Sequence, residues 1–105
     1  MKEDAIKTIV VSENDNLSSE LTALLKDDSR LDVNKTDPSS AYETFHSIDG
    51  DVVFITELTD TKKAISLIRK ILADLPQTPI NIVAPLTSKE FIVEALDAGA
   101  TTYIH

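Results

Sequence analysis

Apolar residues form two kinds of pattern, which alternate from one end of the chain to the other. Short runs of β-branched and other apolar residues, such as 8–11 and 52–55, are typical of strands buried on both faces of a parallel sheet. Between these runs, apolar residues recur every three or four positions, which predicts helices that pack one face against a sheet. No linker or repeat interrupts the series, so we expect a single domain over residues 1–105.

Five strands are predicted from the apolar runs and from one alternating segment. The run 52–55 is the most hydrophobic and is expected to lie in the centre of the sheet. Leu31 and Val33 alternate with polar residues, which is typical of a half-exposed strand near a sheet edge. The predicted strands are 8–11, 31–33, 52–55, 80–83 and 101–104.

Two helices are predicted in the first half of the chain. Asp15 or Asn16 is placed to cap the first helix, and Asp37 followed by Pro38 is expected to begin the second. The apolar stripe of the first helix has the spacing i, i+4, i+7 and i+8 and consists of Leu17, Leu21, Leu24 and Leu25.

Two further helices are predicted in the second half. The third covers residues 61–75, with Asp60 as its N-cap and Pro76 after its end. The fourth begins with Thr87 and Glu90 in capping-box spacing, and Gly99 supplies the left-handed residue after it. The order β-α-β-α-β-α-β-α-β, with right-handed crossovers, predicts a parallel sheet with helices on both faces.

Charge and composition narrow the classes of function. Eighteen acidic residues against ten basic ones give a net charge of -8, which opposes binding to nucleic acid or to anionic lipid. The absence of cysteine excludes disulfides and thiolate metal sites and is typical of a cytoplasmic protein. No apolar stretch approaches the roughly 20 residues that cross a bilayer. We therefore expect a cytoplasmic domain that inserts into no membrane and binds no nucleic acid directly.

Metal and nucleotide sites lack their usual residues. His46 and His105 are far apart, and no carboxylate flanks either at ligand spacing, so both are expected to be surface histidines. Only Gly50 and Gly99 occur, so the glycine-rich loops that bind phosphates are absent. We expect no metal site and no cofactor.

Three stretches resemble the response-regulator receiver family, also called CheY-like. Residues 7–15 resemble the family's first strand and acidic corner, and residues 51–56 resemble its acceptor strand. Residues 95–104 are the most specific, with an alanine-glycine-alanine turn followed by two small polar residues and an aromatic. The resemblance covers essentially the whole chain. It implies a flavodoxin-like, doubly wound α/β fold of three layers, with a five-stranded parallel sheet in the order 2-1-3-4-5.

The resemblance also implies a specific reaction, the transfer of a phosphoryl group to the domain. Receivers accept a phosphoryl group on an aspartate at the end of the third strand, beside two acidic residues that hold Mg²⁺. A serine or threonine after the fourth strand and a lysine after the fifth complete the pocket. The transfer brings two anionic groups together, so it requires the cation to neutralise them.

Carried over to this sequence, the pocket departs from the family at each of these positions. Thr56 stands at the position of the acceptor aspartate, and Ser12 and Glu13 stand at the positions of the acidic pair. Ala84 stands where the family has its serine or threonine, and the position of the lysine would be residue 106. A threonine hydroxyl stays protonated at neutral pH, and no histidine or lysine is placed beside it as a base. The resemblance thus implies a degenerate phosphoacceptor pocket with no catalytic residue and no useful Mg²⁺ affinity.

Two residues leave alternatives open. A shift of one position puts Glu57 in the acceptor place, as a built-in mimic of the phosphorylated state, although alternation along a strand turns it away from the direction of Thr56. Tyr103 resembles the aromatic that changes rotamer when receivers switch, and it can equally be a tyrosine packed at the edge of the core.

Receivers end with a fifth helix beside the first, and this chain stops before it. One face of the sheet is therefore expected to expose apolar surface, which monomers rarely leave open. Either the chain is the N-terminal part of a longer protein or another subunit covers that face. We expect a fragment that also self-associates.

These observations favour a non-phosphorylatable pseudo-receiver that acts as a protein interaction or dimerisation module in bacterial signalling or assembly. Its expected contact surface is the fourth helix and fifth strand, with Phe91 and Tyr103, and its expected state is a homodimer. The alternative is an active receiver that a histidine kinase phosphorylates through a non-standard acid. A third interpretation is a small-ligand module whose site, at the carboxyl ends of the strands, is lined by the same four pocket residues.

Overall fold

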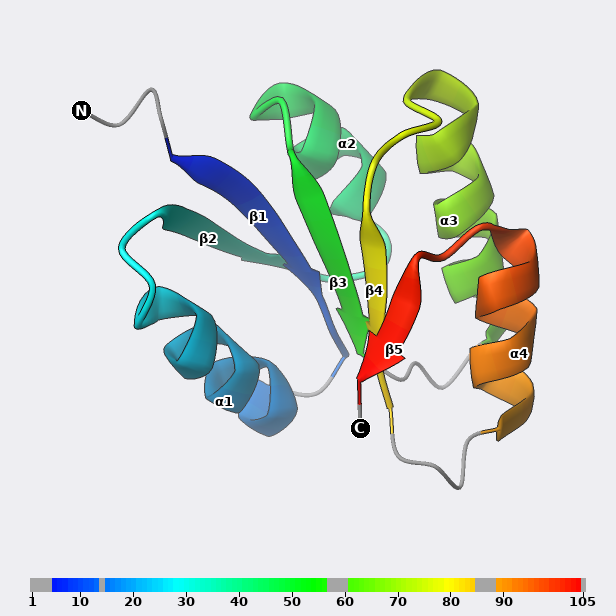
Figure 1. Cartoon of the computed structure of the whole chain (residues 1–105), viewed down its shortest axis with the longest axis horizontal. Helices are drawn as coiled ribbons and strands as arrows, with labels where there is room; N and C mark the ends of the chain where they lie inside the picture. Colours follow the sequence, from blue (N-terminus) through cyan, green and yellow to red (C-terminus); the bar gives the residue numbers. More distant parts are fainter. Residues whose placement is uncertain (1–4, 14, 57–60, 85–88, 105) are drawn as a thin grey trace.

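The computed structural model describes residues 5–13, 15–56, 61–84 and 89–104, and the side chains of all of these except 15–18. Strands and helices alternate strictly along this part of the chain (Figure 1). The elements are β1 (Ile6–Val11), α1 (Asp15–Lys26), β2 (Leu31–Thr36), α2 (Ala41–Ser47), β3 (Val52–Thr56), α3 (Thr61–Asp74), β4 (Ile80–Val83), α4 (Lys89–Ala98) and β5 (Thr102–Ile104).

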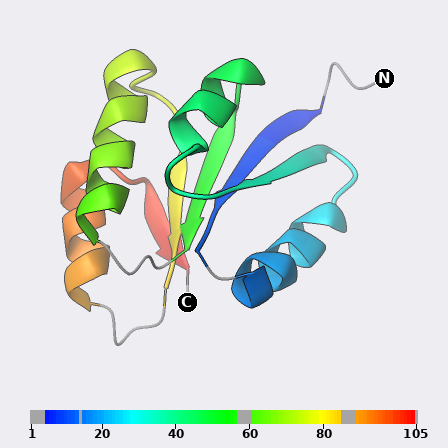
Figure 2. The same ribbon diagram turned by 180° about the vertical axis from the view of Figure 1, so that it is seen from behind.

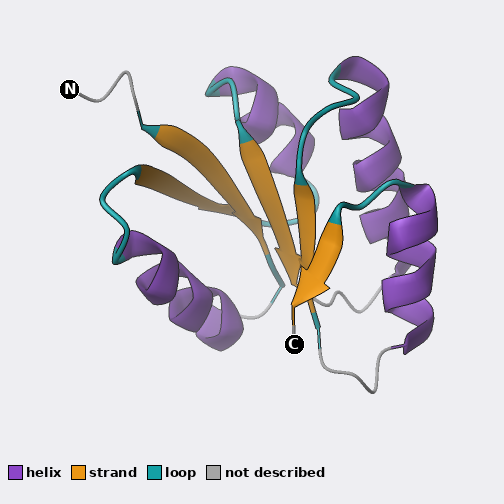
Figure 3. Cartoon of the chain, viewed as in Figure 1, coloured by secondary structure: helices purple, strands orange, loops and turns teal. Residues whose placement is uncertain are grey.

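The strands form one sheet in the order β2-β1-β3-β4-β5, and every neighbouring pair is parallel (Figure 3). The sequence-based prediction of a doubly wound, five-stranded sheet in the order 2-1-3-4-5 is confirmed. β3 is the central strand, as its hydrophobicity predicts, and β2 is an edge strand. The arrangement is that of the flavodoxin-like receiver fold.

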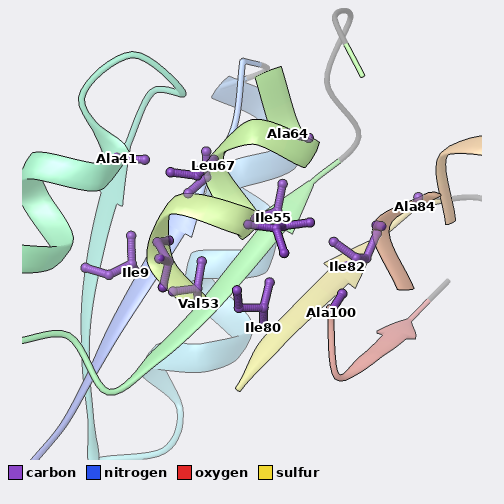
Figure 4. Packing of buried hydrophobic residues seen from close by; sticks show 14 of the residues in the cluster. Ile9, Ala41, Val53, Ile55, Ala64, Leu67, Ile80, Ile82, Ala84 and Ala100 are labelled. Atoms are coloured by element: carbon purple, nitrogen blue, oxygen red, sulfur yellow. The ribbon is translucent and has the colours of Figure 1, made fainter. Parts of the chain in front are cut away.

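Helices lie on both faces of the sheet, with α1 on one face and α2, α3 and α4 on the other (Figures 1 and 2). The main hydrophobic core lies between the sheet and the second group. Alternate strand residues such as Val53, Ile55 and Ile82 are fully buried there and pack around α3 residues such as Leu67 (Figure 4). Each fully buried side chain of this size contributes about 1.5 to 3 kcal/mol to folding.

The face that carries α1 is less completely covered in the described part of the chain. Phe54 and Val83 are half-buried there, whereas their neighbours Ile55 and Ile82, which point to the other face, are fully buried. At the end of β5, Ile104 is 46% exposed. This agrees with the expectation that part of this face is open.

Helix starts were predicted less accurately. The expectation that Asp37 and Pro38 begin α2 is wrong, because residues 38–40 form a turn and the helix starts at Ala41. The Asp37 carboxylate accepts a hydrogen bond from the Ser40 backbone N–H at 2.8 Å, so it stabilises the turn before the helix. The predicted caps Asp60 and Thr87 lie outside the described residues.

The apolar stripe predicted for α1 is also only partly correct. Leu21 and Leu25 are half-buried, but Leu24 is 70% exposed. The helix includes both of its predicted caps, since it starts at Asp15, and the side chain of Leu17 is outside the described set.

Gly99 ends α4 as predicted. Its φ of 118° lies in the region that side chains disfavour, and a Cβ there would meet Leu72 Cδ1 at 2.5 Å. The backbone N–H of Ala100 bonds to the carbonyl of Ala95, which closes the helix end and directs the chain into β5.

Candidate functional site

Three neighbouring strands bring the predicted pocket residues to one edge of the sheet. Ser12 follows β1, Thr56 is the last residue of β3, and Ala84 follows β4. In the register, Val11 pairs with Ile55 and Thr56 pairs with Val83. Ser12, Thr56 and Ala84 therefore lie side by side at the carboxyl ends of the strands, where open α/β sheets bind ligands.

Thr56 is fully buried, and its hydroxyl is already engaged. Its Oγ1 donates a hydrogen bond to the backbone carbonyl of Val11 on the neighbouring strand, at 3.1 Å. The bond holds β3 to β1 where the two strands end. The hydroxyl is therefore bonded to the backbone of the sheet, and the side chain has no exposed surface.

The other pocket residues contribute little negative charge. Ala84 is 4% exposed and its methyl group belongs to the hydrophobic core, while its backbone N–H bonds to the Ile104 carbonyl at 3.0 Å. Glu13 is exposed in the bend after β1, and Ser12 donates its backbone N–H to the Thr36 carbonyl. Among the described side chains, no group of three histidine, cysteine or acidic residues could hold a metal ion. Glu57, the alternative acceptor, lies outside the described residues.

Phe91 and Tyr103, the two residues predicted for the interaction surface, have different environments. Phe91 is 4% exposed and belongs to the hydrophobic core, and its part in a contact surface stays a prediction. Its position on the inner face of α4 turns the ring toward the sheet. Tyr103 is 39% exposed on the edge strand β5, where it pairs with Ile82. On α4, Val93 and Leu96 are exposed large apolar side chains.

A polar cluster between α2 and α3 was not predicted. Tyr42 donates its hydroxyl to the carboxylate of Asp74, and His46 Nε2 lies 3.0 Å from the same oxygen. The hydrogen bond from Tyr42, and then that from His46, lower the pKa of Asp74, and the bond to Asp74 raises the pKa of Tyr42. His46 is a surface residue, as predicted. Tyr42 and His46 share a helix face at spacing i, i+4, which was the one signal for this cluster in the sequence.

No protein-family model and no curated protein matches the sequence. Solved structures do match. A pilus assembly-related protein from Burkholderia pseudomallei has 22% identity and a TM-score of 0.78, over 96% of this chain and 78% of that one. The chemotaxis protein CheY4 of Vibrio cholerae has 18% identity and a TM-score of 0.81, over 95% and 85%.

A response regulator from Thermotoga maritima is similar to the same degree, with 22% identity and a TM-score of 0.79, over 95% of this chain and 83% of that one. The structural neighbours thus include CheY-like receiver domains, and they establish the fold. None of the described helices has the length and apolar character needed to span a bilayer.

Proposed function

We propose that this chain is a pseudo-receiver: a regulatory module with the receiver fold that accepts no phosphoryl group and acts through contacts with other proteins. It catalyses no reaction. The solved neighbours include a chemotaxis protein and a pilus assembly-related protein, which supports a role in bacterial signalling or assembly. The acidic, cysteine-free sequence supports a cytoplasmic location.

The observation that carries the proposal is the buried Thr56 hydroxyl at the receiver's acceptor position. An acceptor must present an anionic or activated oxygen to the donor, and Thr56 presents neither, because its hydroxyl is fully buried and bonds to a backbone carbonyl, which is too weak a base to remove the proton. No described side chain bonds to Oγ1 as a base. The position therefore has the structural role of joining β1 to β3.

The charge of the pocket supports the same conclusion. Phosphoryl transfer to a carboxylate requires a cation between two anions, since two like charges about 4 Å apart repel by about 4 kcal/mol at an effective dielectric constant of 20. Mg²⁺ sites in proteins rely on carboxylates, and the predicted acidic pair retains only Glu13. The methyl group of Ala84 can neither bind a phosphate oxygen nor orient one.

We infer that the partner contacts the surface formed by α4 and β5 around Tyr103. This ring is partly exposed on an edge strand, and α4 exposes the apolar side chains Val93 and Leu96. Partly exposed tyrosines are frequent in protein interfaces, because the ring buries apolar area while its hydroxyl keeps a polar contact. A partner that binds constitutively would contact this surface without any phosphorylation signal.

The proposal is tested by incubating the chain with acetyl phosphate and Mg²⁺ and measuring its intact mass. We expect no increase in mass. A gain of one phosphoryl group that disappears on treatment with hydroxylamine would show an acyl phosphate, and it would support an active receiver with a non-standard acid. An active receiver domain in the same buffer serves as the positive control.

A further inference from the structure

The exposed side of α3 is positively charged, although the chain as a whole is acidic. Lys62, Lys63, Arg69 and Lys70 are all exposed on this helix and make up four of the ten basic residues in the chain. Lys62 and Arg69 are seven residues apart, so they lie on one side of the helix. In a chain with a net charge of -8, this concentration of positive charge needs an explanation.

A groove of about 540 Å³ runs along this side of α3, between α3 and α4. Lys62, Arg69 and Lys70 line it from α3, and Glu94 lines it from α4. Ile65 and Ala73 of α3 also line it. The two helices lie side by side and run in the same direction (Figures 1 and 2).

The α4 side of the groove carries the opposite charge. Glu90, Glu94 and Asp97 are all exposed, and their spacing of four and three residues places them on one face of the helix. Val93 lies between them and is 56% exposed. Of these three residues Glu94 lines the groove, so the basic residues of α3 face one carboxylate of α4, and Glu90 and Asp97 add negative charge on the same face of α4.

Two of the opposite charges, Arg69 on α3 and Glu94 on α4, form no ion pair within the described part of the chain. Arg69 and Glu94 line the same groove, yet neither forms an ion pair with any described residue. Both side chains extend from exposed positions on parallel helices. They are available for contacts with another molecule.

We propose that two copies of this chain associate through the α3–α4 groove, related by a two-fold axis that runs along the groove, parallel to the two helices. Such an axis places α3 of one copy against α4 of the other, and the reverse contact follows by symmetry. Arg69 of each copy then meets Glu94 of the other. Ile65, which lines the groove and is half-buried, supplies apolar contact area beside the charged side chains.

The two signs of charge favour a second copy over other partners. A polyanion such as nucleic acid or an anionic membrane would be attracted by α3 but repelled by the acidic row on α4, one helix away. A partner must present positive charge opposite α4 and negative charge opposite α3. A second copy of the same surface, turned by 180°, presents both.

This surface is separate from the contact proposed around Tyr103, although α4 borders both. The inference rests on the proposal that the domain acts through protein contacts. It does not depend on the result of the phosphorylation experiment, so the proposed function and the proposed dimer can fail independently. A chain that is monomeric and takes up no phosphoryl group would contradict the dimer and leave the proposed function standing.

The test measures the mass of the full chain in solution by sedimentation equilibrium for the wild type, Arg69→Glu, Glu94→Lys and an equimolar mixture of the two variants. We expect a dimer for the wild type. Each single variant should raise the dimer dissociation constant about tenfold or more, because like charges then meet twice across the axis. The mixture should form a heterodimer, because the two altered residues face each other and the unaltered Arg69 and Glu94 face each other.

Matched controls change the same charges far from the groove. Lys35→Glu and Asp32→Lys, at exposed positions on the edge strand β2, alter the net charge equally and should leave the dimer unchanged. A monomeric wild type at the highest soluble concentration would overturn the proposal. So would single variants that dimerise like the wild type, or a mixture that stays monomeric.

Discussion

Replacing Thr56 with aspartate restores the acceptor residue of the receiver family. The change in the free energy of unfolding then measures the cost of a carboxylate at this buried position. The threonine side chain is fully buried and donates its hydroxyl to the Val11 carbonyl. An aspartate at neutral pH has no proton to donate, so its carboxylate would face the carbonyl oxygen without a hydrogen bond. The substitution therefore exchanges a satisfied donor for an uncompensated charge.

The expected loss is large. The hydrogen bond contributes about 1 kcal/mol, and an unpaired buried charge costs about 3 to 5 kcal/mol. Domains of this kind are stabilised by about 5 to 15 kcal/mol, so Thr56→Asp should remain measurable but lose a large part of its stability. Thr56→Val keeps the branched shape and removes the hydroxyl, and it should lose no more than about 1.5 kcal/mol.

Urea unfolding at several pH values separates the cost of the buried charge from the loss of the hydrogen bond. Burial should raise the pKa of the introduced carboxyl above its unfolded value, so the penalty is full above the folded pKa and disappears as pH falls below the unfolded one. Thr56→Val should show no such change.

The reasoning would be refuted if Thr56→Asp were as stable as the wild type at neutral pH. It would equally be refuted if Mg²⁺ rescued the variant. A cation at about 100 times its Kd stabilises a protein by about 2.7 kcal/mol, and we expect no gain.

Four further substitutions test other parts of the structure. Gly99→Ala should lower the free energy of unfolding by about 1 to 3 kcal/mol in urea, because of the positive φ and the contact with Leu72; an unchanged value would contradict the assigned backbone. Phe91→Ala should cost about 3 to 5 kcal/mol as a core truncation, whereas Tyr103→Ala should change thermal stability little and weaken partner binding. The lowered pKa of Asp74 means that its hydrogen bonds stabilise the fold above the ordinary carboxyl pKa, and that this contribution is lost as pH falls through the lowered value. Thermal melts of Asp74→Asn should therefore differ from the wild type at neutral pH and converge with it in acid, and parallel curves would count against this.

The architecture could be predicted from the sequence because its determinants are local. A run such as Val52–Ile55 and the helical spacing on α3 fix the type of each element, and right-handed crossovers then leave few ways to order the strands. The turn at Gly99 needs a positive φ, which identifies glycine directly. The grouping of Ser12, Thr56 and Ala84 follows from the same strand order.

Features that depend on contacts distant in the sequence could not be predicted. Tyr42 and Asp74 are 32 residues apart, and only the packing of α2 on α3 brings them together. The spacing of Leu24 fits an apolar stripe, but the side chain is exposed, because periodicity does not show how far a neighbouring layer extends. Phe91 was assigned to a surface by resemblance, whereas its burial depends on how α4 is rotated against the sheet.

We propose that the corner formed by Ser12, Glu13 and Thr56 has no useful affinity for a divalent cation. Titrating the uniformly ¹⁵N-labelled chain with Mg²⁺ while recording amide NMR spectra tests it directly, because the amides of these three residues would report any bound cation. We predict that their signals do not shift beyond the small, non-saturating changes of exposed acidic residues elsewhere. A saturable shift at Glu13 and Thr56 would show that the cation site survives, and it would contradict the account.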